Sequence, residues 1–131
     1  MLLDNKYVKQ CIGEELFIDD EKFELLNALA ESVKRWNGLN LVAKSTESDM
    51  YKWHIFDALS IFGLIKRANA ECLIDFGAGS GILGASLKIM GISDVVFIER
   101  SETKLNFIKD VLGLSAFASI DHFNKTLRDI P

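Results

Sequence analysis

The chain has 131 residues, of which 49% are hydrophobic, and its formal net charge at pH 7 is −4. This length suits one folded domain, and the apolar content excludes an intrinsically disordered chain. No apolar run approaches the ~20 residues of a membrane span, and the acidic balance argues against general binding to DNA. The start lacks the pattern of a signal peptide, and Cys11 and Cys72 are isolated cysteines, so we expect a cytoplasmic protein.

The first 70 residues have a helical pattern. Apolar residues recur at helical spacing over residues 23–36. Asp19 precedes this stripe as a suitable N-cap, and Gly38 follows it as a stop signal. The sequence therefore predicts a first helix that ends near residue 36.

A second helix is predicted after a short extended connection over residues 39–44. Its capping-box pattern begins at Thr46, and its apolar spacing continues to about Phe62. His54 and Asp57 lie three residues apart on this helix and therefore share a face. Such a pair suits acid–base catalysis, or it ties the helix to a neighbouring loop; both interpretations stay open.

The pattern changes at residue 71. Residues 72–76 and 95–98 are short apolar runs typical of buried parallel strands. Helical patterns follow each of them, over residues 82–90 and 101–111. This alternation predicts an α/β unit with right-handed connections. We expect a single domain, in which a helical part over residues 1–70 precedes the α/β part.

A glycine-rich turn follows the first predicted strand. Gly77, Gly79 and Gly81 lie at its end, and Glu99 ends the second strand. Glycine permits a positive φ and lets backbone approach a ligand closely. A carboxylate at the tip of the next strand can bind ribose hydroxyls. The pattern indicates a nucleoside-type cofactor, and the alternative is a tight turn without a ligand.

Two cofactors fit this turn. Gly79-x-Gly81-x-x-Gly84 matches the dinucleotide fingerprint, with Glu99 at the spacing of a ribose-binding acid. However, Asp75 precedes the turn, as is typical of S-adenosylmethionine methyltransferases, where no pyrophosphate must be neutralised. Asp75 could orient the glycine loop or reach the ammonium group of the methionine moiety. We therefore favour S-adenosylmethionine over NAD.

Separate motifs in chain order resemble one family, the small-subunit ribosomal RNA methyltransferase G family, also called glucose-inhibited division protein B. Trp36-Asn37-x-x-Asn40-Leu41-Val42 is similar to the family's Trp-Asn-x-x-Asn-Leu-Thr signature. His54-Ile55-x-Asp57-Ala58-Leu59 is similar to its His-Ile-x-Asp-Ser-Leu. The glycine loop, Glu99 and Lys104-Leu105-x-Phe107-Ile108 continue the resemblance.

The resemblance implies a partial Rossmann-like S-adenosylmethionine methyltransferase fold, a parallel sheet with helices, preceded by an N-terminal helical segment. Members transfer a methyl group to N7 of a guanine in 16S ribosomal RNA, so the implied partner is the small ribosomal subunit. No metal is implied. The residues that the resemblance assigns to the cofactor are Asp75, Gly77, Ala78, Gly79, Gly81, Ile82 and Glu99.

The C-terminal part departs from the family. Residues 116–120 resemble a segment that normally lies further downstream, and the family's arginine there falls on Ser115. We therefore expect the third strand and the adenine loop to be missing, and the α/β part over residues 71–131 to be incomplete. Such a chain is expected to be marginally stable or self-associating. The alternatives to a methyltransferase are a noncatalytic remnant that binds cofactor or a partner, and an NAD-type oxidoreductase.

Overall fold

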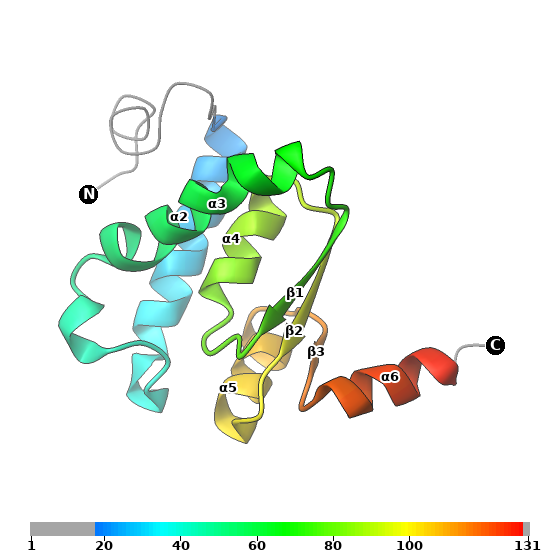
Figure 1. The fold of residues 1–131 in the computed structure, drawn as a ribbon. Helices are drawn as coiled ribbons and strands as arrows, with labels where there is room; N and C mark the ends of the chain where they lie inside the picture. Colours follow the sequence, from blue (N-terminus) through cyan, green and yellow to red (C-terminus); the bar gives the residue numbers. More distant parts are fainter. Residues whose placement is uncertain (1–17, 130–131) are drawn as a thin grey trace.

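The structure is a computed structural model that describes residues 18–129, so Cys11 lies outside the described range. The sheet is parallel, with the strand order β1-β2-β3, and the predicted α/β class with a preceding helical segment is confirmed (Figure 1). The strands are β1 (Cys72–Phe76), β2 (Asp94–Ile98) and β3 (Ala116–Phe117). The helices are α2 (Asp20–Arg35), α3 (Phe56–Arg67), α4 (Ile82–Met90), α5 (Glu102–Asn106) and α6 (Ile120–Arg128).

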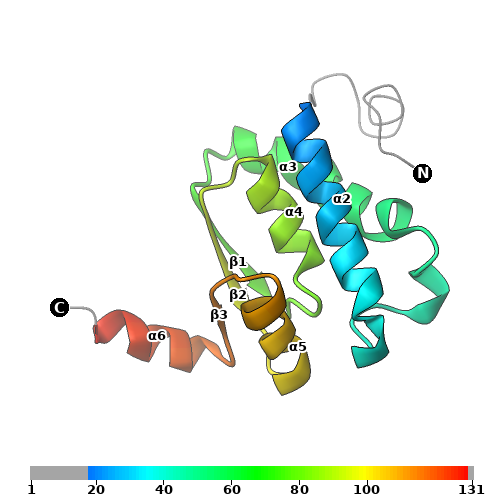
Figure 2. The same ribbon diagram turned by 180° about the vertical axis from the view of Figure 1, so that it is seen from behind.

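The strand order determines where the helices lie. Each successive strand is added on the same side of the previous one, so right-handed connections place α4 and α5 on one face of the sheet. Figures 1 and 2 show this arrangement, with α2 and α3 packed on the outer side of α4. The core between these layers contains Leu26, Val33, Leu59, Phe97 and Ile108, all buried.

The opposite face of the sheet has no helical cover in the described part of the chain. On β1, Ile74 is 52% exposed and Phe76 is 71% exposed. The prediction that β1 is buried is therefore wrong on this face. Parallel strands are usually covered on both faces, but here β1 is an edge strand and both crossover helices lie on the other side.

The predicted start of the first helix is confirmed. The backbone N–H of Lys22 donates to the Asp19 side chain at 2.9 Å. After α2, however, residues 37–39 and 44–46 form short 3-10 turns rather than an extended connection. Asn37 holds this connection, because its side chain accepts from Val42 N at 2.9 Å and donates to Glu47 at 3.1 Å.

The second helix differs from its prediction at both ends. It begins with a π-helical turn, Tyr51–Ile55, and continues as α3 through Gly63 to Arg67. The Thr46 hydroxyl donates to the Ala43 carbonyl instead of capping this helix. Asp49 accepts from Lys52 N at 3.1 Å, so the cap lies three residues later than predicted.

The sheet has a third strand, which the family resemblance did not lead us to expect. Ala116 and Phe117 pair in parallel with Phe97 and Ile98 of β2. Gly113 takes a φ of 66°, a left-handed conformation that lets the chain turn back after the helix that precedes it. The segment that resembles a downstream part of the family therefore occupies the position beside β2.

The open face of β1 generates a prediction about self-association. We expect the apparent mass of the chain to rise with concentration, because an exposed apolar edge strand is a template for pairing. Ile74→Lys should lower this association, with a change in the free energy of unfolding of about 0.5 kcal/mol or less, as is usual for surface substitutions.

Light scattering over a concentration series measures the association. Leu64→Lys is the matched control, since Leu64 is an exposed apolar residue on α3 rather than on the sheet. An equal effect of the two substitutions, or a strictly monomeric parent chain, would contradict the prediction.

Candidate functional site

A buried carboxylate lies at the carboxyl end of β2. Glu99 is 8% exposed. One of its oxygens, Oε2, accepts from Gly79 N at 2.6 Å, and the other, Oε1, accepts from Ser101 N at 2.9 Å. Glu99 therefore joins the glycine loop to the start of α5. Hydrogen bonds to an ionised acceptor are stronger than neutral ones, so this side chain fixes the shape of the loop.

The glycine loop also bonds to the end of β2 through its backbone. Gly77 N and Ala78 N both donate to the Ile98 carbonyl, at 2.9 and 3.0 Å. Gly77, Gly79 and Gly81 all have positive φ values, from 59° to 78°. A Cβ at Gly77 or Gly79 would meet no atom within 4 Å, so the loop presents bare backbone to open space.

The second carboxylate of the site, Asp75, caps the helix that follows the loop. Its Oδ2 accepts from Gly84 N, in the first turn of α4, at 3.1 Å. Burial raises the pKa of the Asp75 carboxyl above its usual value, the hydrogen bond from Gly84 opposes this shift, and the negative charge of Glu99 adds to it. A negative charge suits this end of a helix.

A cavity of about 630 Å³ opens beside Glu99. This volume lies within the range of small-molecule sites, roughly 300–1,000 Å³. The ends of β1 and β2 and the segments that follow all three strands provide its lining: Phe76, Gly77, Ile98, Glu99, Arg100, Ala118, Ser119, Ile120 and Asp121. The cavity thus lies where open α/β sheets bind ligands, outside the carboxyl ends of the strands.

Two of the seven predicted cofactor residues line this cavity, and the other five do not. Gly77 and Glu99 line it. Gly81 packs against Ile108, whose side chain lies 3.0 Å from a Cβ built at Gly81. Ile82 is buried in the core. The remaining residues of the predicted set, Asp75, Ala78 and Gly79, shape the loop through the hydrogen bonds described above.

His54 makes one of the two contacts considered from the sequence. Its Nε2 lies 2.8 Å from the Thr46 hydroxyl, so the side chain ties the helix to the turn before it. Burial lowers the pKa of His54, and the charge of Asp57 opposes this shift. Asp57 is exposed, and no His54–Asp57 hydrogen bond is present within residues 18–129.

Sequence reasoning missed the part of the lining that follows β3. Ala118 to Asp121 were expected to lie in a region without an adenine loop. A local signal was present: two apolar residues followed by Ser119 and Asp121, residues that begin helices. The signal was too short to show that Ala116 and Phe117 pair with β2.

Comparison with known proteins identifies the family. The family described as rRNA small subunit methyltransferase G matches residues 22–128. This chain belongs to that family. Among relatives named "Ribosomal RNA small subunit methyltransferase G", the protein of Paramagnetospirillum magneticum is 34% identical over 72% of this chain and 46% of its own length. The protein of Rhodospirillum centenum is 30% identical over 80% of this chain and 49% of its own.

The chain spans about half the length of the curated relatives that it matches. The relative from Rickettsia africae, 34% identical over 72% of this chain, is likewise covered over 48% of its length. No solved structure matches the chain significantly. The match to the family and the identity to these relatives confirm the family resemblance inferred from the motifs.

Neither a membrane-spanning helix nor a metal cluster is found in residues 18–129. None of the helices there combines the length and apolar character needed to cross a membrane. No group of three or more His, Cys, Asp or Glu side chains in this range could hold a metal ion. Cys72, at the start of β1, is a free and exposed thiol.

Close packing at Gly84 generates a stability prediction. A Cβ at this position would lie 2.6 Å from Phe97 Cε1 and 2.9 Å from Asp75 Oδ2. Gly84→Ala should therefore lower the free energy of unfolding by about 1–3 kcal/mol, the usual cost of overpacking. Urea unfolding measures this change. The control is Gly38→Ala, since a Cβ at Gly38 meets no atom within 4 Å; equal costs at both positions would show that α4 does not pack this closely on the sheet.

The Glu99 hydrogen bonds generate a second prediction. In Glu99→Gln one acceptor oxygen becomes an NH₂ group, which faces a backbone donor and leaves it unpaired. The free energy of unfolding should fall by about 1–3 kcal/mol, the cost of an unsatisfied buried group. Glu71→Gln, an exposed position just before β1, is the control. If chemical unfolding gives the Glu99 variant the stability of the control, the carboxylate does not hold the loop.

Proposed function

We propose that this chain binds S-adenosylmethionine and transfers its methyl group to N7 of a guanine in 16S ribosomal RNA. Its family membership over residues 22–128 supports methyl transfer to small-subunit ribosomal RNA. The site supports a nucleoside cofactor, because a buried acceptor, Glu99, lies beside bare glycine backbone and a cavity of sufficient size. Such an enzyme would work in the cytoplasm, where its RNA partner is found.

The backbone N–H groups of the glycine loop already donate hydrogen bonds within the chain, and this favours S-adenosylmethionine over a dinucleotide. A dinucleotide needs free backbone N–H groups at the loop and the helix N-terminus to hold its pyrophosphate. Here the amides of Gly77, Ala78 and Gly79 donate to the end of β2, and the Asp75 carboxylate lies at the first turn of α4. A second anion would be repelled there. S-adenosylmethionine has no phosphate and carries positive charge, so it suits this loop.

The residues present fit the nucleoside part of this cofactor. A carboxylate has about four acceptor sites, and Glu99 uses two of them for Gly79 N and Ser101 N. The others suit the two ribose hydroxyls. The open space beside Gly77 and Gly79 suits the methionine part. In this arrangement Asp75, Ala78, Gly81 and Ile82 support the loop and the start of α4.

The reaction itself needs little from side-chain acids or bases. Bound beside Glu99 and the glycine loop, S-adenosylmethionine would supply a methyl group on a cationic sulfur, which N7 of the guanine would displace. N7 of guanine carries a free lone pair, so no proton has to leave. The chain's contribution is to hold the two reactants in line, which can account for most of the rate. The contact of His54 with Thr46 fits a positioning role, in which His54 holds its helix against the turn before it.

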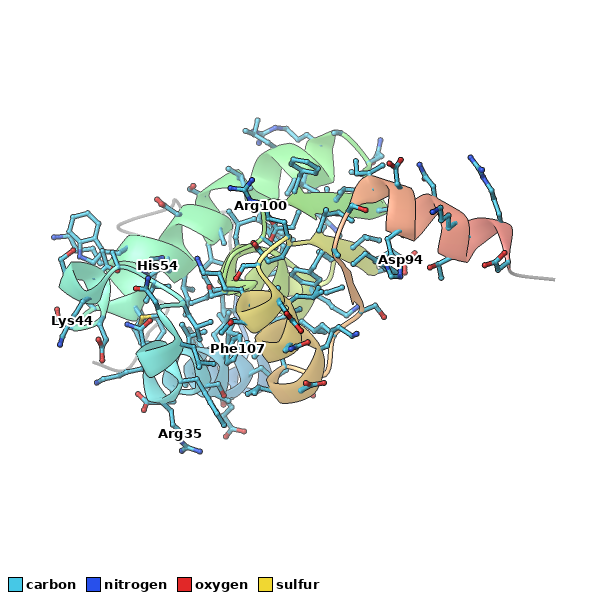
Figure 3. All side chains as sticks on the ribbon, turned by 90° about the horizontal axis from the view of Figure 1, so that it is seen from below. Arg35, Lys44, His54, Asp94, Arg100 and Phe107 are labelled. Carbon is cyan, nitrogen blue, oxygen red and sulfur yellow. The ribbon has the colours of Figure 1, made fainter. Side chains whose placement is uncertain are left out.

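The face at the carboxyl ends of the strands is the proposed RNA side. Figure 3 views the molecule from this side and shows Arg100 near the strand ends, whereas Arg35, Lys44 and His54 lie on the helical part of the chain. Arg100 also lines the cavity. Basic side chains near the site would contact phosphates of the RNA. By contrast, Lys88 belongs to the last turn of α4 and donates to the Ser93 carbonyl, at the opposite end of β2.

A noncatalytic protein that binds the cofactor is the second candidate. The uncovered face of β1, with Ile74 and Phe76 exposed, favours it. In this case the site would bind the nucleoside, and the chain would not hold an RNA substrate in line with it. Binding and methyl transfer must therefore be measured separately.

Ligand-dependent unfolding tests the proposal. S-adenosylhomocysteine should raise the thermal midpoint, because a ligand that binds the folded state stabilises it, and NAD should not. Asp94→Asn, which removes a carboxylate at the end of β2 opposite Glu99, should keep the rise in thermal midpoint. Transfer of a labelled methyl group to undermethylated small subunits then separates the enzyme from the noncatalytic candidate. A shift with NAD alone would overturn the methyltransferase proposal.

A further inference from the structure

We propose that a second copy of this chain covers the open face of the sheet, with the apolar side of α6 from each copy lying on β1 of the other. Both surfaces are present on every copy, so one two-fold axis makes both contacts at once. The proposal goes beyond the proposed function, because it concerns the assembly of the chain rather than its cofactor.

The open face presents alternate residues of β1. Cys72, Ile74 and Phe76 share this side, since residues two apart in a strand point to one face, and all three are exposed. Phe117 of β3 belongs to the same face, because Ile98 is in register with both Phe76 and Phe117. Apolar side chains therefore extend across the face, and no helix within residues 18–129 lies over β1.

The helix α6 has an apolar side that is also open. Ile120, Phe123 and Leu127 recur at helical spacing and form one stripe, in which Ile120 is 42% and Leu127 is 49% exposed. The rings of Phe123 and Phe117 are in contact, with 5.1 Å between their centroids, so the stripe begins at the edge of the open face. Figures 1 and 2 show α6 on the side of the sheet away from α4, projecting outward instead of lying over the strands. The stripe of one copy is therefore free to cover the sheet of another.

The two surfaces match in length. A helix of nine residues, such as α6, is roughly 14 Å long and roughly 10 Å wide. A strand of five residues, such as β1, is roughly 17 Å long, and its neighbour lies roughly 5 Å away. One α6 therefore covers most of β1 together with the adjacent part of β2.

The area of the two surfaces suits a stable dimer. Four large apolar side chains face outward on them: Ile74, Phe76, Ile120 and Leu127. Together they expose roughly 400 Å² on each copy, taking roughly 200 Å² for one large apolar side chain. Reciprocal contacts would bury this area on both copies, roughly 800 Å² in all, which equals the apolar share of a standard interface, roughly 700–1,100 Å².

Charges indicate the direction in which α6 lies on the sheet. Glu71 and Asp94 are exposed carboxylates at the amino ends of β1 and β2, and Arg128 is an exposed cation at the end of α6. An α6 antiparallel to the strands brings Arg128 to these carboxylates. The reverse direction would bring Asp121, in the first turn of α6, to the same place. Charge complementarity of this kind fixes orientation more than affinity.

Light scattering on the full chain over a concentration series tests the arrangement. The parent should approach twice the mass of one chain. Ile74→Lys on the sheet and Leu127→Glu on the helix should each raise the dissociation constant at least about tenfold, because a charge would enter an apolar contact. Thr126→Glu, an exposed position on the polar side of α6, is the matched control and should associate like the parent.

Mixing the two weakened variants tests whether the contact is reciprocal. The sheet of Leu127→Glu and the helix of Ile74→Lys are unaltered, so a mixed pair keeps one contact and brings opposite charges together in the other. The mixture should regain a mass that neither variant reaches alone, which would also show that both variants fold. A mixture no heavier than its components would overturn the proposal. Association of Leu127→Glu equal to the parent would indicate pairing of β1 edges and would overturn it too.

The thiol of Cys72 provides a second measurement. It is free and exposed on the open face. In a Cys11→Ser background, its reaction with a thiol reagent should slow as the chain associates, whereas pairing of β1 edges would leave this face in solvent. A parent that stays monomeric would overturn the proposal, and a Cys72 that is protected in that monomer would show that the chain covers its own face.

Discussion

Hydrogen bonding to the Glu99 carboxylate is the interaction on which the proposed ligand-binding edge of this molecule depends. Its two oxygens accept from Gly79 N and Ser101 N, so one buried side chain joins the glycine loop, the end of β2 and the start of α5. The backbone of the same residue donates to Phe117, which joins β3 to this edge. Because these bonds use only part of the acceptor capacity of a carboxylate, Glu99 has further acceptor sites for the ribose of the proposed cofactor.

The strand order gives the fold its asymmetry. Since β1, β2 and β3 follow one another in space, α4 and α5 cover one face, and Ile74 and Phe76 remain exposed on the other. The cavity opens at the carboxyl ends of these strands and includes Phe76 in its lining. Binding at the site and contacts of the open face therefore share a residue, and changes at Phe76 would affect both.

Local signals in the sequence were sufficient for the elements that position the site. The Asp19 cap, the β1–glycine turn–α4 unit and Glu99 at the tip of β2 all follow from short-range patterns. The later start of the second helix at Asp49 was not predicted, because Thr46 bonds instead to Ala43 and His54. The place of β3 and the exposure of β1 were not predictable locally, since strand pairing and helix cover depend on residues distant in sequence.

The most direct test of this account is the backbone amide of Gly79, followed by NMR in uniformly ¹⁵N-labelled protein. The account predicts that this amide exchanges slowly with solvent, because it donates to a buried carboxylate at 2.6 Å. It also predicts that S-adenosylhomocysteine shifts the resonances of Gly79, Ser101 and residues 118–121. An amide at Gly79 that exchanges as fast as an open loop, together with ligand-induced shifts confined to other parts of the chain, would contradict the account.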